Sequence, residues 1–175
     1  EIPPERVDEC VRAFSSALRE RVRSAYPLPD NEIVEFEVVT DKPWSGFNYY
    51  KGDYQSTVAV NADLKQQMSN LPRLVAHESY PGHHTEHCRK EQFLVDEGHQ
   101  NDQTIFLVNT PQCLMAEGLA DHALAAIVGP EWGTWAQEIY ADLGLRFDAG
   151  RAMGVGRATG GEQFGLAVTG DVGRG

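Results

Sequence analysis

Residues 77–87 constrain this chain more than any other stretch, because they place a proline and a glycine inside a cluster of histidines. Their sequence is H-E-S-Y-P-G-H-H-T-E-H, which contains four of the six histidines of the protein. Histidine is the commonest protein ligand for transition metals, and a neighbouring carboxylate can accept a proton from a metal-activated water. An apolar helical run precedes the cluster. We therefore interpret this stretch as a metal site rather than as a histidine-rich helix surface.

The composition of the chain is that of one soluble globular domain. A chain of 175 residues is long enough to bury a core, and its 41% hydrophobic and 23% charged residues are ordinary for a globular protein. A formal net charge of -11 argues against nucleic acid or an anionic membrane surface as a partner. No apolar run approaches the roughly 18 to 20 residues of a membrane span, and no signal peptide opens the chain. The three cysteines form no C-x-x-C pair, so we expect a reducing, cytoplasmic location.

Four segments have the apolar spacing or the composition of helices. They are residues 4–25, a segment that begins at Asn70, residues 113–128 and residues 131–145. The helix at residues 113–128 is apolar almost all round, so we expect it to be buried.

Three shorter segments are rich in β-branched or aromatic residues: residues 33–40, 47–50 and 57–61. They predict a small antiparallel sheet, and the whole pattern predicts a mainly helical α+β fold. We assign residues 1–150 to one domain. Residues 151–175 are rich in glycine and lack an apolar period, so we expect a flexible tail that contributes little packing.

The spacing of the histidines does not fit the common helical zinc motif H-E-x-x-H, in which the two histidines lie at i and i+4. The residue four positions after His77 is Pro81. His84 would share the face of His77, but about 10.5 Å further along an unbroken helix, which is too far for one zinc ion. Pro81 and Gly82 allow the helix to bulge. A bulge of two residues would bring His83 to the position of the second ligand.

The third ligand should come from another helix. Glu117 is a carboxylate in an otherwise apolar segment, where an unpaired charge would be costly. Asp121 follows one turn later on the same face. Because metal-bound histidines usually donate their second N–H to a carboxylate, Asp121 is placed to receive such a hydrogen bond.

Two other sets of ligands remain open. His84 can substitute for His83, and the run from His83 to His87 reads H-x-x-E-H, the inverted zinc motif, with Glu86 as base. That second frame needs no bulge, but it leaves Pro81 and Gly82 without a purpose. We expect Cys88 to be a structural thiol rather than a ligand. The candidates for an oxyanion donor are His122, Tyr80 and Tyr140.

H-E-S-Y-P-G-H-H, followed by E-G-L-A at residues 117–120, resembles a bacterial family of largely uncharacterised proteins marked by H-E-x-x-P-G-H-H and E-G-x-A. That family belongs to the zincin-type metallopeptidases of the gluzincin kind, with two histidines and a glutamate on zinc. The resemblance covers about residues 45–130. It implies a helical protein with a small sheet, whose edge strand binds an extended peptide by β-augmentation. Family members are considerably longer, so we expect residues 1–150 to be the zincin-like core of a longer protein.

The sequence therefore predicts a zinc-dependent peptidase that acts on a peptide substrate. Zinc would be held by His77, His83 and Glu117, with Glu78 as the base that takes a proton from the attacking water. Asp121 would accept a hydrogen bond from a metal-bound histidine. The alternative is a catalytically silent metal-binding or scaffold domain, or a truncated and inactive peptidase core.

Overall fold

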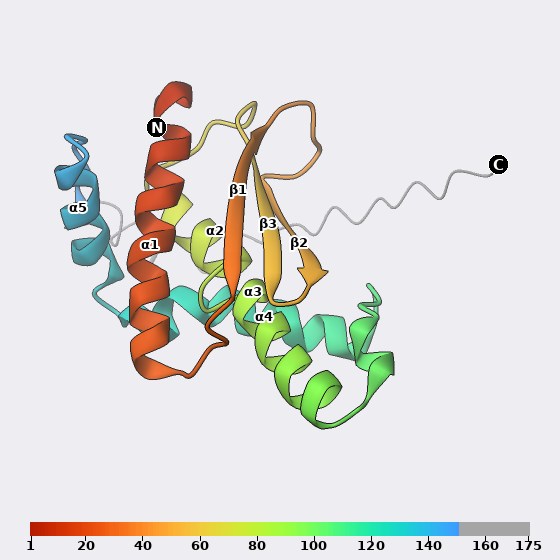
Figure 1. Ribbon diagram of the computed structural model, residues 1–175. Coiled ribbons are helices and arrows are strands. Elements are labelled where there is room, and N and C mark those ends of the chain that lie inside the picture. Colours follow the sequence, from red (N-terminus) through yellow and green to blue (C-terminus); the bar gives the residue numbers. More distant parts are fainter. Residues whose placement is uncertain (151–175) are drawn as a thin grey trace.

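The computed structural model describes residues 1–150, which fold as helices around a small sheet (Figure 1). The predicted tail of residues 151–175 lies outside the described residues. The helices and strands are, in chain order, η1 (Pro4–Arg6), α1 (Val7–Ala25), β1 (Ile33–Val39), β2 (Gly46–Gly52), β3 (Gln55–Asn61), α2 (Leu71–Glu78), α3 (His83–Lys90), η2 (Glu91–Glu97), η3 (Asn101–Thr104), α4 (Pro111–Val128) and α5 (Trp132–Asp142). The predicted α+β class is confirmed.

The three strands form a mixed sheet in the order β1-β3-β2. β2 and β3 are antiparallel neighbours, joined by a two-residue turn in which Asp53 and Tyr54 both have positive φ, as the tightest hairpins require. β3 pairs with β1 in parallel. The prediction of an antiparallel sheet was therefore wrong for this pair. The chain reverses twice between β1 and β3, and the more apolar β3 takes the central, buried position.

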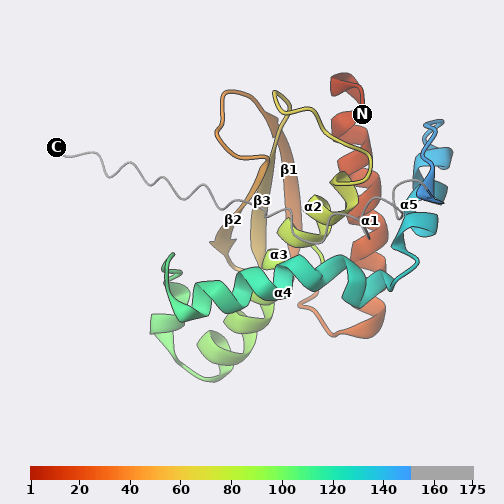
Figure 2. The same ribbon diagram turned by 180° about the vertical axis from the view of Figure 1, so that it is seen from behind.

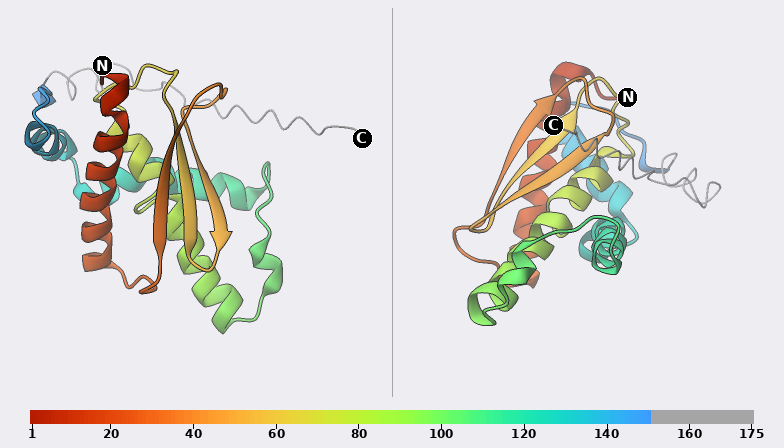
Figure 3. Two further views of the ribbon diagram at one scale, coloured as in Figure 1. Left: turned by 45° about the horizontal axis from the view of Figure 1, so that its top comes forward. Right: turned by 90° about the vertical axis from the view of Figure 1, so that its right-hand side faces the viewer.

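The helices gather on one face of the sheet. In Figure 2, α2 and α4 lie in front of the strands, and the right-hand view of Figure 3 shows the sheet nearly edge-on with helices on one side. α1 runs beside β1 and contacts α2 and α5. On the other face of β2, the rings of Phe47 and Tyr49 are exposed and contact each other.

The core is built on the apolar stripe of α1. Val7, Val11, Phe14, Leu18 and Val22 are all buried, as their 3-to-4 spacing predicts. The ring of Phe14 packs edge-on against Trp135 and Tyr140 of α5, with centroids 5.5 and 4.8 Å apart. α1 is thus fixed between α5 and the sheet, and it also packs against α2.

α4 is not buried all round, contrary to the expectation for residues 113–128. Its Ala116, Ala120 and Leu124 face inward, whereas Leu114 and Leu119 are 74% and 62% exposed. Because apolar residues lie on every side of this helix, the sequence alone does not show which side packs against the rest of the protein. The buried side of α4 lies against α2, and this contact brings Glu117 toward the histidines.

Candidate metal centre

The helix that carries His77 and Glu78 ends at Glu78, and a second helix begins at His83. The predicted bulge in one helix is therefore replaced by a break between two helices. Pro81 has no N–H to donate to the His77 carbonyl. Instead, the N–H of Gly82 donates to the carbonyl oxygen of Ala76 at 3.0 Å, which closes a tight connection between α2 and α3. The peptide bond between Tyr80 and Pro81 is cis.

Gly82 is required by the closeness of the backbone around it. A Cβ atom at this position would lie 1.8 Å from the carbonyl oxygen of His77 and 2.4 Å from that of Ala76. Those atoms belong to the main chain of α2 and cannot rotate away as a side chain would. Glycine thus lets the start of α3 approach the end of α2.

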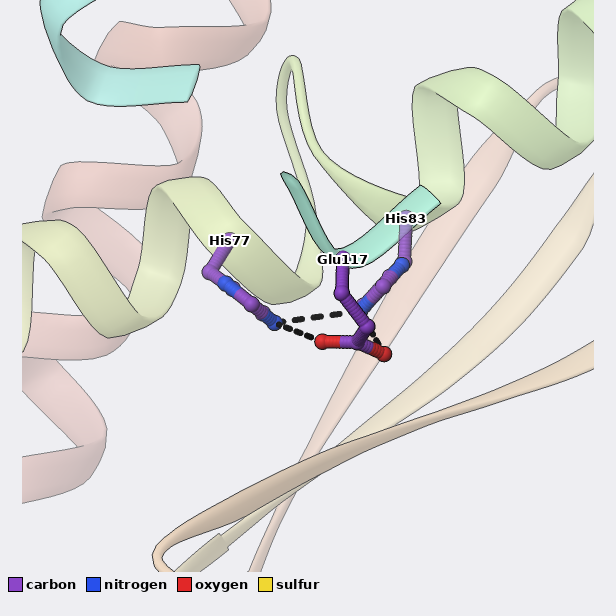
Figure 4. Close-up of side chains that lie close together, drawn as sticks. All are labelled: His77, His83 and Glu117. Atoms are coloured by element: carbon purple, nitrogen blue, oxygen red, sulfur yellow. Dashed lines mark hydrogen bonds and ion pairs between the residues drawn. The ribbon is translucent and has the colours of Figure 1, made fainter. Parts of the chain in front are cut away.

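The break brings His77, His83 and Glu117 together (Figure 4). The Nε2 atoms of the two histidines are 3.1 Å apart. One carboxylate oxygen of Glu117 lies 3.3 Å from Nε2 of His77, and the other lies 3.4 Å from Nε2 of His83. One candidate ligand atom from each residue falls within 4.8 Å of the others.

This donor set fits a zinc ion. Two imidazole nitrogens and one carboxylate oxygen form a known ligand set of catalytic zinc, which leaves a fourth position for water or substrate. The side chains of the three residues are 16%, 11% and 26% exposed, so the group is sheltered yet open to solvent. An ion at this position would be held from three separate helices.

The electrostatics around the three residues favour a cation. Hydrogen bonding to His77, and next to His83, lowers the pKa of Glu117 to about 2. Burial acts to lower the pKa of His77, but the hydrogen bond with Glu117 and the charges of Glu78, Glu117 and Asp121 outweigh it, so the pKa is raised. The negative potential that favours a proton on His77 would also favour a metal ion.

Asp121 supports His77 from the side away from His83. Its Oδ1 lies 3.1 Å from Nδ1 of His77, while Nε2 of the same ring faces the other candidate ligands. This is the arrangement in which a carboxylate fixes the tautomer and orientation of a metal-binding histidine.

Glu78 is buried next to the histidines, at 7% exposure. Burial raises its pKa, and the charge of Glu117 acts in the same direction. A carboxylate with a raised pKa is a better proton acceptor near neutral pH. The side-chain amide of Asn48 in β2 donates to the backbone carbonyl of Glu78 at 2.7 Å, which ties the end of α2 to the edge of the sheet. Nothing in the residue pattern around Asn48 indicated this role.

The other histidines of the cluster lie elsewhere. His84 is fully buried and directed to Ser56 and Glu32. The ring of His87 stacks on Tyr50 at 4.7 Å, and its Nδ1 lies 3.5 Å from Glu86. Among residues 1–150, neither belongs to the group of possible metal ligands, so the geometry favours the first frame over H-x-x-E-H.

Two of the three candidate oxyanion donors are directed into the core. The hydroxyl of Tyr80 donates to Glu32, and that of Tyr140 donates to the carbonyl oxygen of Met68. His122 is exposed on α4. Cys88 is buried beside His84, outside the metal group, as expected for a structural thiol.

A small cavity adjoins the site where α2 passes α4. It has a volume of about 200 Å³ and is lined by Arg73, His77, Ala120, Asp121 and Leu124.

In the part of the chain that the structure describes, no helix combines the length and the apolar character needed to cross a membrane. Comparisons with protein-family models, curated proteins and solved structures found no match.

Proposed function

We propose that this protein is a zinc-dependent peptidase. The observation that carries the proposal is the convergence of His77, His83 and Glu117 within 4.8 Å, with the buried Glu78 beside them. A zinc ion held there would polarise the substrate carbonyl and make water a better nucleophile at neutral pH. This donor set, together with an adjacent base, is the combination that hydrolytic zinc sites use.

In this proposal, the residues of the chain have separate tasks. His77, His83 and Glu117 hold the metal, and Asp121 orients His77 through Nδ1. Glu78 accepts the proton of the attacking water and later passes it to the leaving amine. Its buried position and raised pKa suit both transfers.

The sheet offers a place for an extended peptide. Within residues 1–150, β2 pairs only with β3, so its outer edge has backbone N–H and C=O groups available to a further strand. Asn48 fastens this strand to the end of α2, next to Glu78. A peptide that pairs with β2 would run alongside the metal ligands, which supports a peptide as the substrate.

The second candidate is a metal-binding domain without catalysis. The size of the adjoining cavity favours it, because about 200 Å³ is below the roughly 300–1,000 Å³ of ordinary ligand pockets. The raised pKa and burial of Glu78 favour the enzyme.

Turnover of a peptide library separates the two functions. The zinc-loaded protein, the chelator-treated protein and the Glu78→Gln variant are incubated with the same library, and new termini are identified by mass spectrometry. Cleavage by the zinc-loaded protein alone is the expected result. Tight zinc binding without cleavage would support the metal-binding domain instead.

A further inference from the structure

A second cluster of polar side chains surrounds the buried carboxylate of Glu32 and includes residues close in the chain to the candidate metal ligands. This residue comes directly before β1, and its side chain is fully buried. One carboxylate oxygen accepts hydrogen bonds from Nε of Arg19 at 2.8 Å and from a guanidinium nitrogen of Arg23 at 2.7 Å. The other accepts from the hydroxyl of Tyr80 and lies 3.2 Å from Nε2 of His84.

Of the two residues that meet at this second oxygen, one lies in the connection between α2 and α3 and the other lies in the first turn of α3. Tyr80 directly precedes Pro81, and His84 directly follows His83. Both side chains are buried, and their rings are in edge-to-face contact at 5.1 Å. One oxygen of Glu32 thus contacts both the connection between the two histidine-bearing helices and the start of α3.

His84 is held from its other side as well. Its Nδ1 lies 2.8 Å from the hydroxyl of Ser56 in β3. With both ring nitrogens engaged, the imidazole is fixed between the sheet and Glu32. Because His83 is its neighbour in the chain, fixing His84 restricts the first turn of α3, from which His83 extends toward the metal centre.

The carboxylate of Glu32 remains ionised in this position. Burial acts to raise its pKa, but hydrogen bonds from His84, Tyr80, Arg23 and Arg19 outweigh it, so the pKa falls to about 2. Desolvating a charge is expensive, and a well-packed apolar residue often stabilises a core equally well. The buried ionic network of Glu32 is therefore better explained by the geometry that it holds than by a gain in stability.

We propose that Glu32 is a positioning residue for the metal centre: through Tyr80 and His84 it fixes the α2–α3 connection and thereby the separation of His77 and His83. The inference rests on the proposed metal site. The hydrogen bonds and ion pairs of the Glu32 carboxylate are with Arg19, Arg23, Tyr80 and His84, and none of these residues belongs to the candidate ligand group. Its effect on the metal would be transmitted through the turn.

Cobalt binding tests the proposal, because the visible absorption of Co²⁺ reports the arrangement of its ligands. Metal-free Glu32→Gln and Tyr80→Phe are titrated with Co²⁺ beside the unmodified protein. Glu35→Gln is the matched control, since Glu35 lies in the following strand with a side chain that is 63% exposed and paired with Lys51. Circular dichroism of each metal-free protein measures its fold.

We expect Glu32→Gln to bind Co²⁺ about 10- to 100-fold more weakly, with an altered absorption spectrum, while Glu35→Gln matches the unmodified protein. Tyr80→Phe removes one hydrogen bond and leaves Glu32 with its other partners, so it should remain folded and show the same change to a smaller degree. Native affinity and spectrum in both folded variants would overturn the positioning role and leave the metal site standing. If the unmodified protein bound no Co²⁺, the metal site would fail and this inference with it.

Discussion

The Nε2 atoms of His77 and His83 lie 3.1 Å apart, although the two residues belong to different helices. Two nitrogen ligands at 2.0–2.1 Å from a tetrahedral zinc ion are about 3.3–3.4 Å apart. In one regular helix, a spacing of six residues would correspond to a rise of about 9 Å. The break at residues 79–82 is therefore what makes these two histidines a possible pair of ligands.

The first prediction concerns which residues hold the metal. His77→Ala, His83→Ala and Glu117→Ala should each lose the bound zinc, because each removes one of three converging donors. His87→Ala should keep it, since that ring stacks on Tyr50 instead. Zinc content per chain, measured by elemental analysis after purification without added metal, checks the prediction. Loss of zinc in His87→Ala but not in His77→Ala would restore the inverted motif.

The second prediction separates metal binding from chemistry. Glu78→Gln should retain about one zinc per chain and lose peptide hydrolysis by roughly 10²- to 10⁴-fold, as expected when a general base is removed. Glu86→Gln is the control, because Glu86 would be the base in the alternative frame. Initial rates on a peptide that the parent cleaves are compared at equal zinc loading. A native rate in Glu78→Gln would show that another group takes the proton.

The third prediction concerns the partner of His77. Asp121→Asn should weaken zinc affinity by roughly 10- to 100-fold without abolishing binding, because the amide supports Nδ1 of His77 less well than the carboxylate does. Asp142→Asn is a suitable control, as Asp142 is exposed at the end of α5. Competition with a chromophoric chelator measures both affinities. Equal zinc affinities in the two variants would show that Asp121 does not support the metal-binding role of His77.

The sequence singled out these candidate residues where their types were unusual for their surroundings. Glu117 stood out as a carboxylate in a mostly apolar segment, and Pro81 and Gly82 marked the interruption between histidines. The break between α2 and α3 differs in form from the expected bulge, because hydrogen bonding around a proline depends on which carbonyls are within reach.

Features that depend on tertiary contacts escaped prediction. Glu32 is an ordinary glutamate before a strand, and only the fold shows that Arg19 and His84 converge on it. The parallel pairing of β1 with β3 depends on which strand is central, which alternation within one strand does not encode. The exposed side of α4 could not be predicted either, because Leu114 and Leu119 are apolar residues of the kind that usually lie in a core.

The fourth prediction concerns acid stability. The pKa of Glu32 falls from its ordinary value of 4.5 to about 2 in the folded protein. Its contribution to stability is therefore fully present above pH 4.5 and is lost as the pH falls through about 2. By linkage, this contribution amounts to roughly 3 kcal/mol at most. In Glu32→Gln, which has no carboxylate to protonate, the stability should fall less steeply across this window.

Urea unfolding of the metal-free proteins at several pH values between 5 and 2 measures this difference. Glu117, whose pKa is also lowered to about 2, contributes to the slope in both proteins, so the variant should retain part of the pH dependence. Parallel curves for Glu32→Gln and the parent would contradict the assignment.

The last prediction concerns the two glycines nearest the metal centre in sequence. Gly82→Ala should destabilise the protein and release the metal, because the new methyl group would lie 1.8 Å from the His77 carbonyl oxygen. Relief requires the start of α3 to move away from α2, which separates His83 from His77. Overpacking of this kind costs about 1–3 kcal/mol or more.

Gly118→Ala is the matched control, because Gly118 is next to Glu117 and no described atom lies within 4 Å of its added Cβ. There the substitution should stabilise α4 by up to about 1 kcal/mol and leave zinc content unchanged. Urea unfolding and zinc content of both variants check the pair, and a Gly82→Ala protein with native stability and one zinc would show that the close approach of α3 to α2 does not hold the ligands together.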